Sequence, residues 1–203
     1  MTIVRTGGGG AVAVAPWAAE PDHAQDQSGL ALRGMDTEPS TTASQPTDGR
    51  TGPVQEVAAA AERAGISIDL VRMDGQVPTA AAAAERLGCT VAQIANSLIF
   101  DADGEPLLVI ASGAHRVDTK KVAADLGYRK VRRASPEFVL EHTGQEVGGV
   151  APFGHPAPVR TVIDADLAAE EKLWAGGGDD YTMIAISYAD LVRGTGGEVR
   201  DVR

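Results

Sequence analysis

The stretch "IANSLIFDADGEPLLVIAS", residues Ile94–Ser112, holds two apolar runs separated by a short polar segment. The runs at 94–100 and 106–112 are rich in Ile, Leu and Val, as β-strands commonly are. Between them lies Asp103-Gly104, and an Asp-Gly pair between two apolar runs is typical of a tight hairpin turn. The stretch therefore predicts a β-hairpin, around which the rest of the fold is arranged.

Further helices and strands are predicted on both sides of this hairpin. Several helical segments end at a glycine, which readily adopts the left-handed conformation of a helix C-terminus. Strands and helices do not alternate strictly along the chain. This order favours an α+β fold, a mixed sheet surrounded by helices, over a doubly wound parallel sheet. The predicted helices are 53–65, 78–88, 118–127, 135–144 and 187–194, and the further strands are 66–73, 159–164 and 181–187, with a strand or helix end near 172–178.

Residues 1–52 differ from the remainder of the chain. They are rich in Gly, Ser, Thr, Pro, Asp and Gln and show no sustained apolar periodicity. Such a segment cannot bury enough apolar surface to offset the entropy lost on ordering. We therefore predict a disordered tail over 1–52 and a single domain over 53–203, with Met35 as an alternative start.

The composition argues against several classes of protein. The single cysteine, Cys89, excludes an internal disulfide, and the unclustered histidines predict no metal site and no cofactor. No apolar run reaches the roughly 18 residues that a membrane span requires. The glycine-rich N-terminus lacks the apolar run of a signal peptide, which favours a cytoplasmic protein. The net charge of −10 argues against nonspecific binding of nucleic acid.

A basic patch nevertheless lies within residues 116–133, where the only acidic residues are Asp118 and Asp125. Such a patch could contact the phosphates of a nucleic acid, or it could be the solvated face of a helix. Its cationic residues are Arg116, Lys120, Lys121, Arg129, Lys130, Arg132 and Arg133.

The segment "GGVAPFGHP", Gly148–Pro156, is dense in glycine and proline and precedes an apolar run. Glycine lets a backbone approach a ligand closely, and Pro152 stiffens the chain. The segment is either a simple turn or a pocket loop whose N–H groups near Gly148 and Gly149 bind a carbonyl oxygen or a water. A second glycine run, 176–178, offers the same alternatives.

Several motifs in order, "AAERLG", "QIANSLIF", "RVDTKKVAADLG", "TGQEVGGVAPFGH", "TVID" and "WAGGG", resemble the YbaK-type aminoacyl-tRNA deacylases. These are relatives of the editing domain inserted in bacterial prolyl-tRNA synthetases, and the resemblance covers about residues 54–200. It implies a curved, partly barrel-like mixed sheet. It also implies hydrolysis of the ester between a wrong amino acid and the terminal adenosine of tRNA. The implied partners are the acceptor end of mischarged tRNA and, as a second candidate, an aminoacyl-tRNA synthetase.

The resemblance also assigns site residues. In the family, a glycine-xxx-proline loop lines the pocket, and here that loop is Gly148–Pro152. No side chain of the family clearly acts as a general base. The ribose hydroxyl of the substrate is thought to help activate the water. The implied catalytic residues are Asn96, Gly148, Gly149 and Pro152. The implied substrate contacts are Ser97, Arg116, Phe153, Gly154, His155, Gly176, Gly177 and Thr182, with Lys120 and Lys121 contacting tRNA phosphates.

This sequence departs from the family at Asn96, where a lysine precedes the serine or threonine of the family motif. Losing a charge-assisted hydrogen bond costs about 1.5–3 kcal/mol. Arg116 or His155 could supply the missing group. His155 could equally be a structural hydrogen-bonding residue, and His115 is expected on the surface. Thr182 stands where the cysteine-clearing members carry an acid, so their substrate preference does not transfer.

Three functions follow from these observations. The first is a free-standing deacylase, a carboxylic ester hydrolase that clears mischarged tRNA. The second is a binding module of the same fold that recognises an aminoacyl-adenosine end or a nucleotide without turnover. The third is a protein-interaction domain that docks through residues 1–52.

Overall fold

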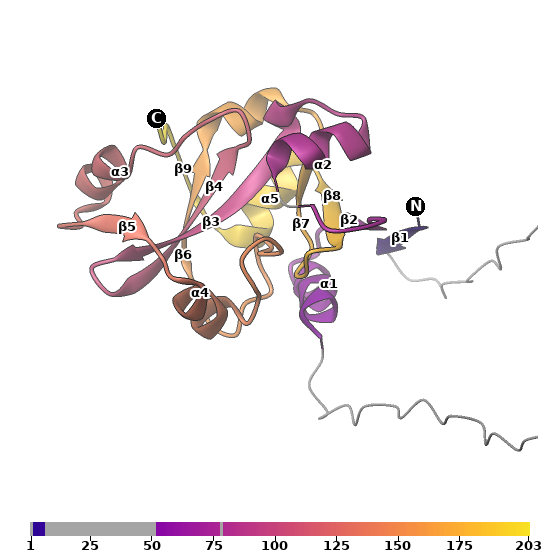
Figure 1. Cartoon of the computed structure of the whole chain (residues 1–203), viewed down its shortest axis with the longest axis horizontal. Coiled ribbons are helices and arrows are strands. Elements are labelled where there is room, and N and C mark those ends of the chain that lie inside the picture. Colours follow the sequence, from indigo (N-terminus) through magenta and orange to yellow (C-terminus); the bar gives the residue numbers. More distant parts are fainter. Residues whose placement is uncertain (1, 7–51, 78) are drawn as a thin grey trace, which may run out of the picture. The chain divides into compact units, whose positions relative to one another are not determined.

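The computed structural model of this protein describes residues 2–6, 52–77 and 79–203 (Figure 1). Most of the predicted tail, residues 7–51 with Met35, lies outside the described residues. Within the described part, no helix is long and apolar enough to cross a membrane.

A mixed sheet of nine strands forms the centre of the fold, with the order β1-β2-β8-β7-β3-β4-β6-β9 and with β5 paired to β3 beside this path. Strand β4 runs antiparallel to β3 and parallel to β6. The predicted mixed sheet is confirmed, and it is open, because β1 and β9 lie at its two ends. The strands are β1 (Thr2–Thr6), β2 (Ile68–Arg72), β3 (Ile94–Ala102), β4 (Glu105–Ser112), β5 (Val131–Arg133), β6 (Arg160–Asp164), β7 (Leu173–Gly176), β8 (Thr182–Ile186) and β9 (Glu198–Arg200).

The predicted hairpin is the longest pairing in the sheet and joins β3 to β4. Ala102 lies opposite Glu105, so that only Asp103 and Gly104 make the turn. Their φ angles are 56° and 96°, as a type I′ turn requires at both central residues. The Gly104 N–H donates to Oδ1 of Asp101 at 2.7 Å, which helps to close the turn.

Helices cover both faces of the sheet, as Figure 1 shows. Helices α1, α4 and α5 pack on one face, together with the 3-10 helix η2, while α2 and α3 pack on the other. All five predicted helices are confirmed, and Asp118 and Ser135 cap theirs as expected. The helices are α1 (Pro53–Arg63), α2 (Ala80–Leu87), η1 (Val91–Gln93), α3 (Thr119–Leu126), α4 (Pro136–Thr143), η2 (Ala165–Ala169) and α5 (Tyr188–Thr195).

Three strands were not predicted from the sequence. Strands β5 and β9 have three residues each and contain more charged than apolar residues, so no periodicity reveals them. Strand β1 lies in the segment assigned to the tail and pairs antiparallel with β2, from Thr2 opposite Arg72 to Thr6 opposite Ile68.

Among the described residues, the middle of β3 has a strand partner on one side only. Strand β4 pairs along one whole edge of β3. On the other edge, β7 pairs with Ile94 and Ala95, and β5 pairs with Phe100–Ala102. Residues Asn96–Ile99 are therefore open on that edge, and this gap positions the candidate site.

Candidate functional site

A cavity of about 910 Å³ opens at the gap in β3. Its walls come from α2, the middle of β3, the segment before α3, strand β5, helix α4 and the loop after α4. The polar, charged and glycine residues of its lining include Asn96, Ser97, His115, Arg116, Arg132, Arg133, Gly148 and Gly176.

The open edge of β3 provides polar groups to this cavity. Backbone N–H and C=O groups of successive residues alternate between the two edges of a strand, so half of those in Asn96–Ile99 face away from β4. Side chains alternate between the two faces, which places Asn96 on the side of α2 and α3 and Ser97 on the side of α4. A ligand here meets backbone donors and acceptors, an amide and a hydroxyl.

Five of the predicted site residues line the cavity, namely Asn96, Ser97, Arg116, Gly148 and Gly176. They come from β3, the segment before α3, the loop after α4 and the end of β7. The fold thus brings together residues up to 80 positions apart, between Asn96 and Gly176. The remaining predicted residues lie behind the walls or outside the cavity.

The loop Gly148–Pro152 borders the cavity with its first residue. Gly148 has a φ of 113°, and a Cβ added there would lie 2.8 Å from Oδ1 of Asp180. Gly149 is buried, and its N–H already donates to the Glu146 carbonyl at 3.2 Å. Of the two glycines predicted to bind substrate, Gly148 therefore has an N–H without a partner among the described residues, whereas the N–H of Gly149 is already used within the loop.

The second glycine run packs mainly against protein backbone. A Cβ on Gly176 would lie 2.5 Å from the Val150 carbonyl oxygen, and one on Gly178 would lie 2.9 Å from that of Pro53. Gly177 and Thr182 are buried against each other behind the wall, and Oγ1 of Thr182 accepts from Arg72 at 3.2 Å. At Gly176 and Gly178, glycine is needed because the backbone of another segment lies so close that a Cβ would have no room.

Pro152, Phe153 and Gly154 are absent from the cavity lining and attach the loop to the core. Phe153 is 7% exposed and belongs to the cluster that includes α1. Gly154 has a φ of 86°, and a Cβ there would lie 2.9 Å from Cα of Val57 in α1. These three residues hold the loop in place from behind.

His155 lies on the same supporting side. Its Nε2 is 3.0 Å from the Ala151 carbonyl oxygen, so the neutral ring donates to the loop backbone. Burial lowers the pKa of the imidazole below its usual 6.5, although the hydrogen bond to Ala151 opposes this. The structure therefore favours the structural interpretation of His155.

We expect His155 to make folding stability depend on pH. The charged imidazole is disfavoured in the folded state, so the unfolded chain takes up this proton at a higher pH. Stability should therefore fall as the pH drops below the unfolded value, by up to about 1.4 kcal/mol per pH unit. Urea unfolding at about pH 7.5 and about pH 5.5 measures this loss, which should be smaller in His155→Gln. Equal losses in both proteins would contradict the prediction.

The lysines predicted to contact tRNA lie outside the cavity lining. Lys120 is exposed, while Lys121 donates to the Asp201 carbonyl at 2.5 Å and pairs with its carboxylate at 2.9 Å. Elsewhere in the basic patch, Arg132 pairs with Asp101 at 2.7 Å and Arg129 with Asp103 at 3.6 Å. The patch is therefore partly neutralised within the protein itself.

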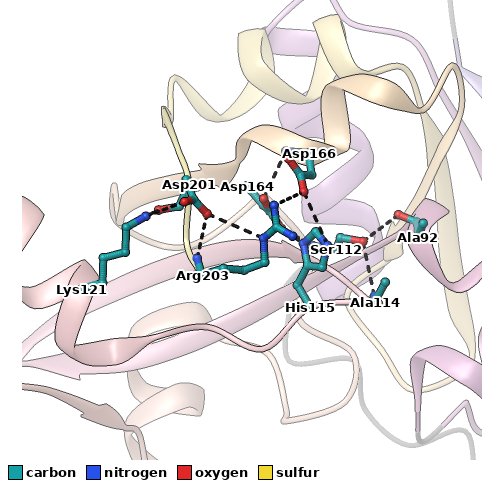
Figure 2. A network of polar contacts seen from close by, with 9 residues as sticks. All are labelled: Ala92, Ser112, Ala114, His115, Lys121, Asp164, Asp166, Asp201 and Arg203. Atoms are coloured by element: carbon teal, nitrogen blue, oxygen red, sulfur yellow. Dashed lines mark hydrogen bonds and ion pairs between the residues drawn. The ribbon is translucent and has the colours of Figure 1, made fainter.

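A buried hydrogen-bonded pair, His115 and Asp164, lies at the cavity wall and is not evident from the sequence. Nδ1 of His115 lies 2.7 Å from Oδ2 of Asp164, whose side chain is only 1% exposed (Figure 2). Asp164 also accepts from the N–H groups of Ser112 and Asp166, each at 3.2 Å. His115 is thus half-buried rather than on the surface as expected, and no local pattern links it to an aspartate 49 positions later.

The same place holds the one group of potential metal ligands among the described residues. Ligand atoms of His115, Asp164 and Asp166 all lie within 4.8 Å of one another. Each already has a protein partner, since Asp166 pairs with Arg203 at 2.5 Å and His115 with Asp164. These contacts join β6, η2 and the segment before α3.

Ser97 carries an unusual polar atom in the cavity wall. Its Oγ is buried and has no hydrogen-bond partner among the described residues. A buried polar atom without a partner costs about 1–3 kcal/mol of stability. Such an atom is a candidate ligand contact, because a ligand hydrogen bond would satisfy it.

We expect Ser97→Ala to leave stability unchanged or slightly higher, because it removes an unpartnered hydroxyl. The matched change Ser112→Ala should instead destabilise by about 0.5–1.5 kcal/mol per hydrogen bond. Its Oγ donates to the Ala92 carbonyl at 3.1 Å and accepts from the Ala114 N–H at 3.3 Å. Urea unfolding of the two variants tests this, and equal destabilisation would refute it.

Comparisons with known proteins identify the family of this chain. The family model described as "Aminoacyl-tRNA editing domain" matches residues 74–193. YwhH of Bacillus subtilis (strain 168), an uncharacterised protein, is 32% identical over 124 residues, which cover 61% of this chain and 78% of YwhH. The proline–tRNA ligase of Lysinibacillus sphaericus (strain C3-41) is 33% identical over 89 residues, which cover 44% of this chain but only 16% of that enzyme.

Two solved structures are similar over most of their own length. The first is described as a candidate trans-editing enzyme for prolyl-tRNA synthetase. It has a TM-score of 0.71 and 32% identity, covering 76% of this chain and 98% of that one. The second, the hypothetical protein APE2540, has a TM-score of 0.67 and 32% identity, covering 72% and 98%. By its family match, its relatives and its fold, this chain belongs to the aminoacyl-tRNA editing domain family.

Proposed function

We propose that the protein is a free-standing deacylase that hydrolyses the ester of mischarged tRNA. The observation that carries this proposal is the open edge of β3 inside a cavity that Asn96, Ser97 and Gly148 all line, in a member of the editing-domain family. An unpaired strand edge offers donors and acceptors that are already held in place by the sheet. An ester group needs such groups when its carbonyl oxygen becomes negatively charged.

In the proposed reaction, water attacks the ester carbonyl, the tetrahedral oxyanion collapses, and the free amino acid and the 3′ end of the tRNA leave. The N–H of Gly148 and those on the open edge of β3 are the donors proposed for the oxyanion. Removing one such donor typically lowers kcat by about 10²- to 10³-fold. The family resemblance assigns activation of the water to the ribose hydroxyl of the substrate, so no side-chain base is required.

The proposed substrate is the acceptor end of a tRNA, with the amino acid in the cavity and Asn96 and Ser97 as polar contacts. The similarity to proline–tRNA ligases makes tRNA(Pro) the first tRNA to test, with a synthetase as a second partner. Gly149, Pro152, Phe153, Gly154 and His155 support the loop in this scheme rather than touching the substrate. The proposal places the protein with the translation machinery of the cytoplasm.

The proposal is tested by incubating the full chain with tRNA(Pro) carrying Ala, Cys, Ser or Thr esters. Hydrolysis of at least one ester, faster than in buffer alone, is the expected result. The assay belongs at low salt, since backbone binding weakens steeply as salt rises. Ser97→Ala, if stably folded, should hydrolyse the preferred ester more slowly.

The binding-module hypothesis predicts a different outcome of the same experiment. It expects saturable binding of a 3′-aminoacylamide analogue of the tRNA end, which cannot be hydrolysed as an ester, together with no turnover of any ester. Asn96 motivates this second hypothesis, because a neutral amide stands where the family resemblance leads us to expect a lysine. Binding without turnover would replace the deacylase proposal.

A further inference from the structure

Arg116 is a cavity-lining cation without a partner in the described part of the chain. It is exposed, and its guanidinium has no hydrogen bond or ion pair within the described ranges. Arg132, which also lines the cavity, is instead paired with Asp101. A planar guanidinium binds phosphate through two parallel hydrogen bonds, so Arg116 is chemically suited to an anionic group.

The backbone on both sides of Arg116 is held in place. On one side, the His115 N–H donates to the Ser112 carbonyl at 2.9 Å, and the His115 ring is bound to the buried Asp164. Figure 2 shows His115 lying beside Ser112 and the two aspartates. On the other side, the Asp118 N–H donates to the Val202 carbonyl at 2.8 Å. A charge held by such a fixed segment loses less entropy when it binds a ligand.

The sheet register places this segment at the Asn96 end of the cavity. Asn96 pairs with Ala111, and Ile110 pairs with Ile163, so Asp164 lies beside Ala111 in the same row across the sheet. Asn96 and Asp164 are two strand spacings apart, which is about 10 Å. His115 is bonded to Asp164 and also lines the cavity, so it links Asp164 to the cavity wall.

Arg133, which also lines the cavity and has no partner within the described ranges, lies at the opposite end. It pairs in β5 with Phe100, four residues along β3 from Asn96, which corresponds to about 13 Å. The second group considered from the sequence, His155, is bonded to Ala151 behind the loop and does not line the cavity.

We propose that Arg116 binds a phosphate of the tRNA 3′ end next to Asn96, and that the His115–Asp164 pair is the device that positions it. This inference rests on the proposed function and names one contact within it. Arg116 then provides the positive charge that Asn96 lacks. His115 and Asp164 are positioning residues in this scheme, because they act through Arg116.

A binding measurement tests the phosphate contact even if the protein turns over no ester. The two probes are the trinucleotide CCA with a 3′-alanylamide and the nucleoside 3′-alanylamido-adenosine, which has no phosphate. Arg116→Gln should weaken binding of the trinucleotide roughly ten- to hundredfold, as expected for loss of a charge-assisted hydrogen bond, and leave nucleoside binding within about twofold. Arg63→Gln, an exposed change on α1 outside the cavity, should alter neither.

Equal weakening of both probes by Arg116→Gln would overturn the proposal, as would no weakening of either. If wild type binds neither probe, the contact is refuted together with the binding site. If wild type binds the trinucleotide but hydrolyses no ester, the deacylase proposal fails. The Arg116 contact is then decided by the binding of the two probes to wild type and to Arg116→Gln.

A charge relocated to Asn96 gives a second, independent test. Because Asn96 lines the same end of the cavity, a lysine there can reach the same phosphate. In the Arg116→Gln background, Asn96→Lys should restore trinucleotide binding at least about tenfold, whereas in Arg133→Gln it should restore little. Equal restoration in both backgrounds, or none in Arg116→Gln, would contradict the assigned contact.

The positioning role is tested at His115. His115→Ala should weaken trinucleotide binding without affecting the nucleoside, because Arg116 loses its fixed backbone. His115→Asn should recover most of that loss, since the amide N–H₂ of asparagine can donate to Asp164 in place of Nδ1. If His115→Ala affects both probes alike, or if asparagine gives no recovery, His115 does not act through Arg116.

Discussion

Gly149→Ala is expected to abolish ester hydrolysis and to destabilise the fold. A Cβ at this position would lie 2.4 Å from the Asp179 carbonyl carbon and 2.6 Å from its Cα. Both atoms belong to backbone, so neither side can swing away, and overpacking of this kind costs about 1–3 kcal/mol or more. The loop 148–152 and the loop 176–181 must separate, which moves Gly148 and Gly176 in the cavity wall.

Thermal and urea unfolding together with the tRNA ester assay measure this effect. Gly65→Ala is the matched control, because Gly65 has a φ of 62° but nothing within 4 Å of an added Cβ. It should lose only about 1 kcal/mol through the left-handed backbone and keep its activity. A stable, active Gly149→Ala protein would mean that the contact between the two loops does not shape the cavity.

Asp164→Ala is expected to be the most destabilising single change among His115, Asp164 and Asp166. It leaves the His115 ring and the Ser112 N–H without their buried acceptor, and each buried donor left unsatisfied costs about 1–3 kcal/mol. Asp164→Asn keeps one oxygen and should lose about 1.5–3 kcal/mol, the value of a charge-assisted hydrogen bond. Urea unfolding of both variants gives the two free energies.

Asp166→Ala serves as the control for Asp164. Its side chain is 47% exposed and pairs with Arg203 at the surface, so its loss should cost about 1 kcal/mol or less. If Asp166→Ala destabilises as much as Asp164→Ala, the stability lies in the surface ion pair and not in the buried one. Coupling between His115 and Asp164 can then be measured with the His115→Ala/Asp164→Ala double variant.

The local pattern of residues was sufficient for the principal elements of the fold. The Asp-Gly turn predicted the β3–β4 hairpin, and glycine ends with Asp or Ser caps predicted the helices, because these preferences act within a few residues. The same reasoning missed β5 and β9. Strands of three residues are stabilised by their neighbours in the sheet, and their own residues carry no period.

The candidate site was only partly predictable. Asn96, Ser97, Arg116 and Gly148 were identified and do line the cavity. The His115–Asp164 pair was not, because it depends on β6 lying beside β4, which local sequence does not reveal.

The sequence by itself determined the principal helices and strands, the mixed sheet around one hairpin and the family resemblance, since turn chemistry, helix caps and motif order are all local. Only the tertiary structure decided that β3 is open at Asn96–Ile99, because β7 and β5 stop short of each other there. It also decided which glycines border the cavity and which touch backbone. A glycine lets a ligand or another protein segment come close to the backbone. Which of the two lies there depends on contacts between residues far apart in the chain.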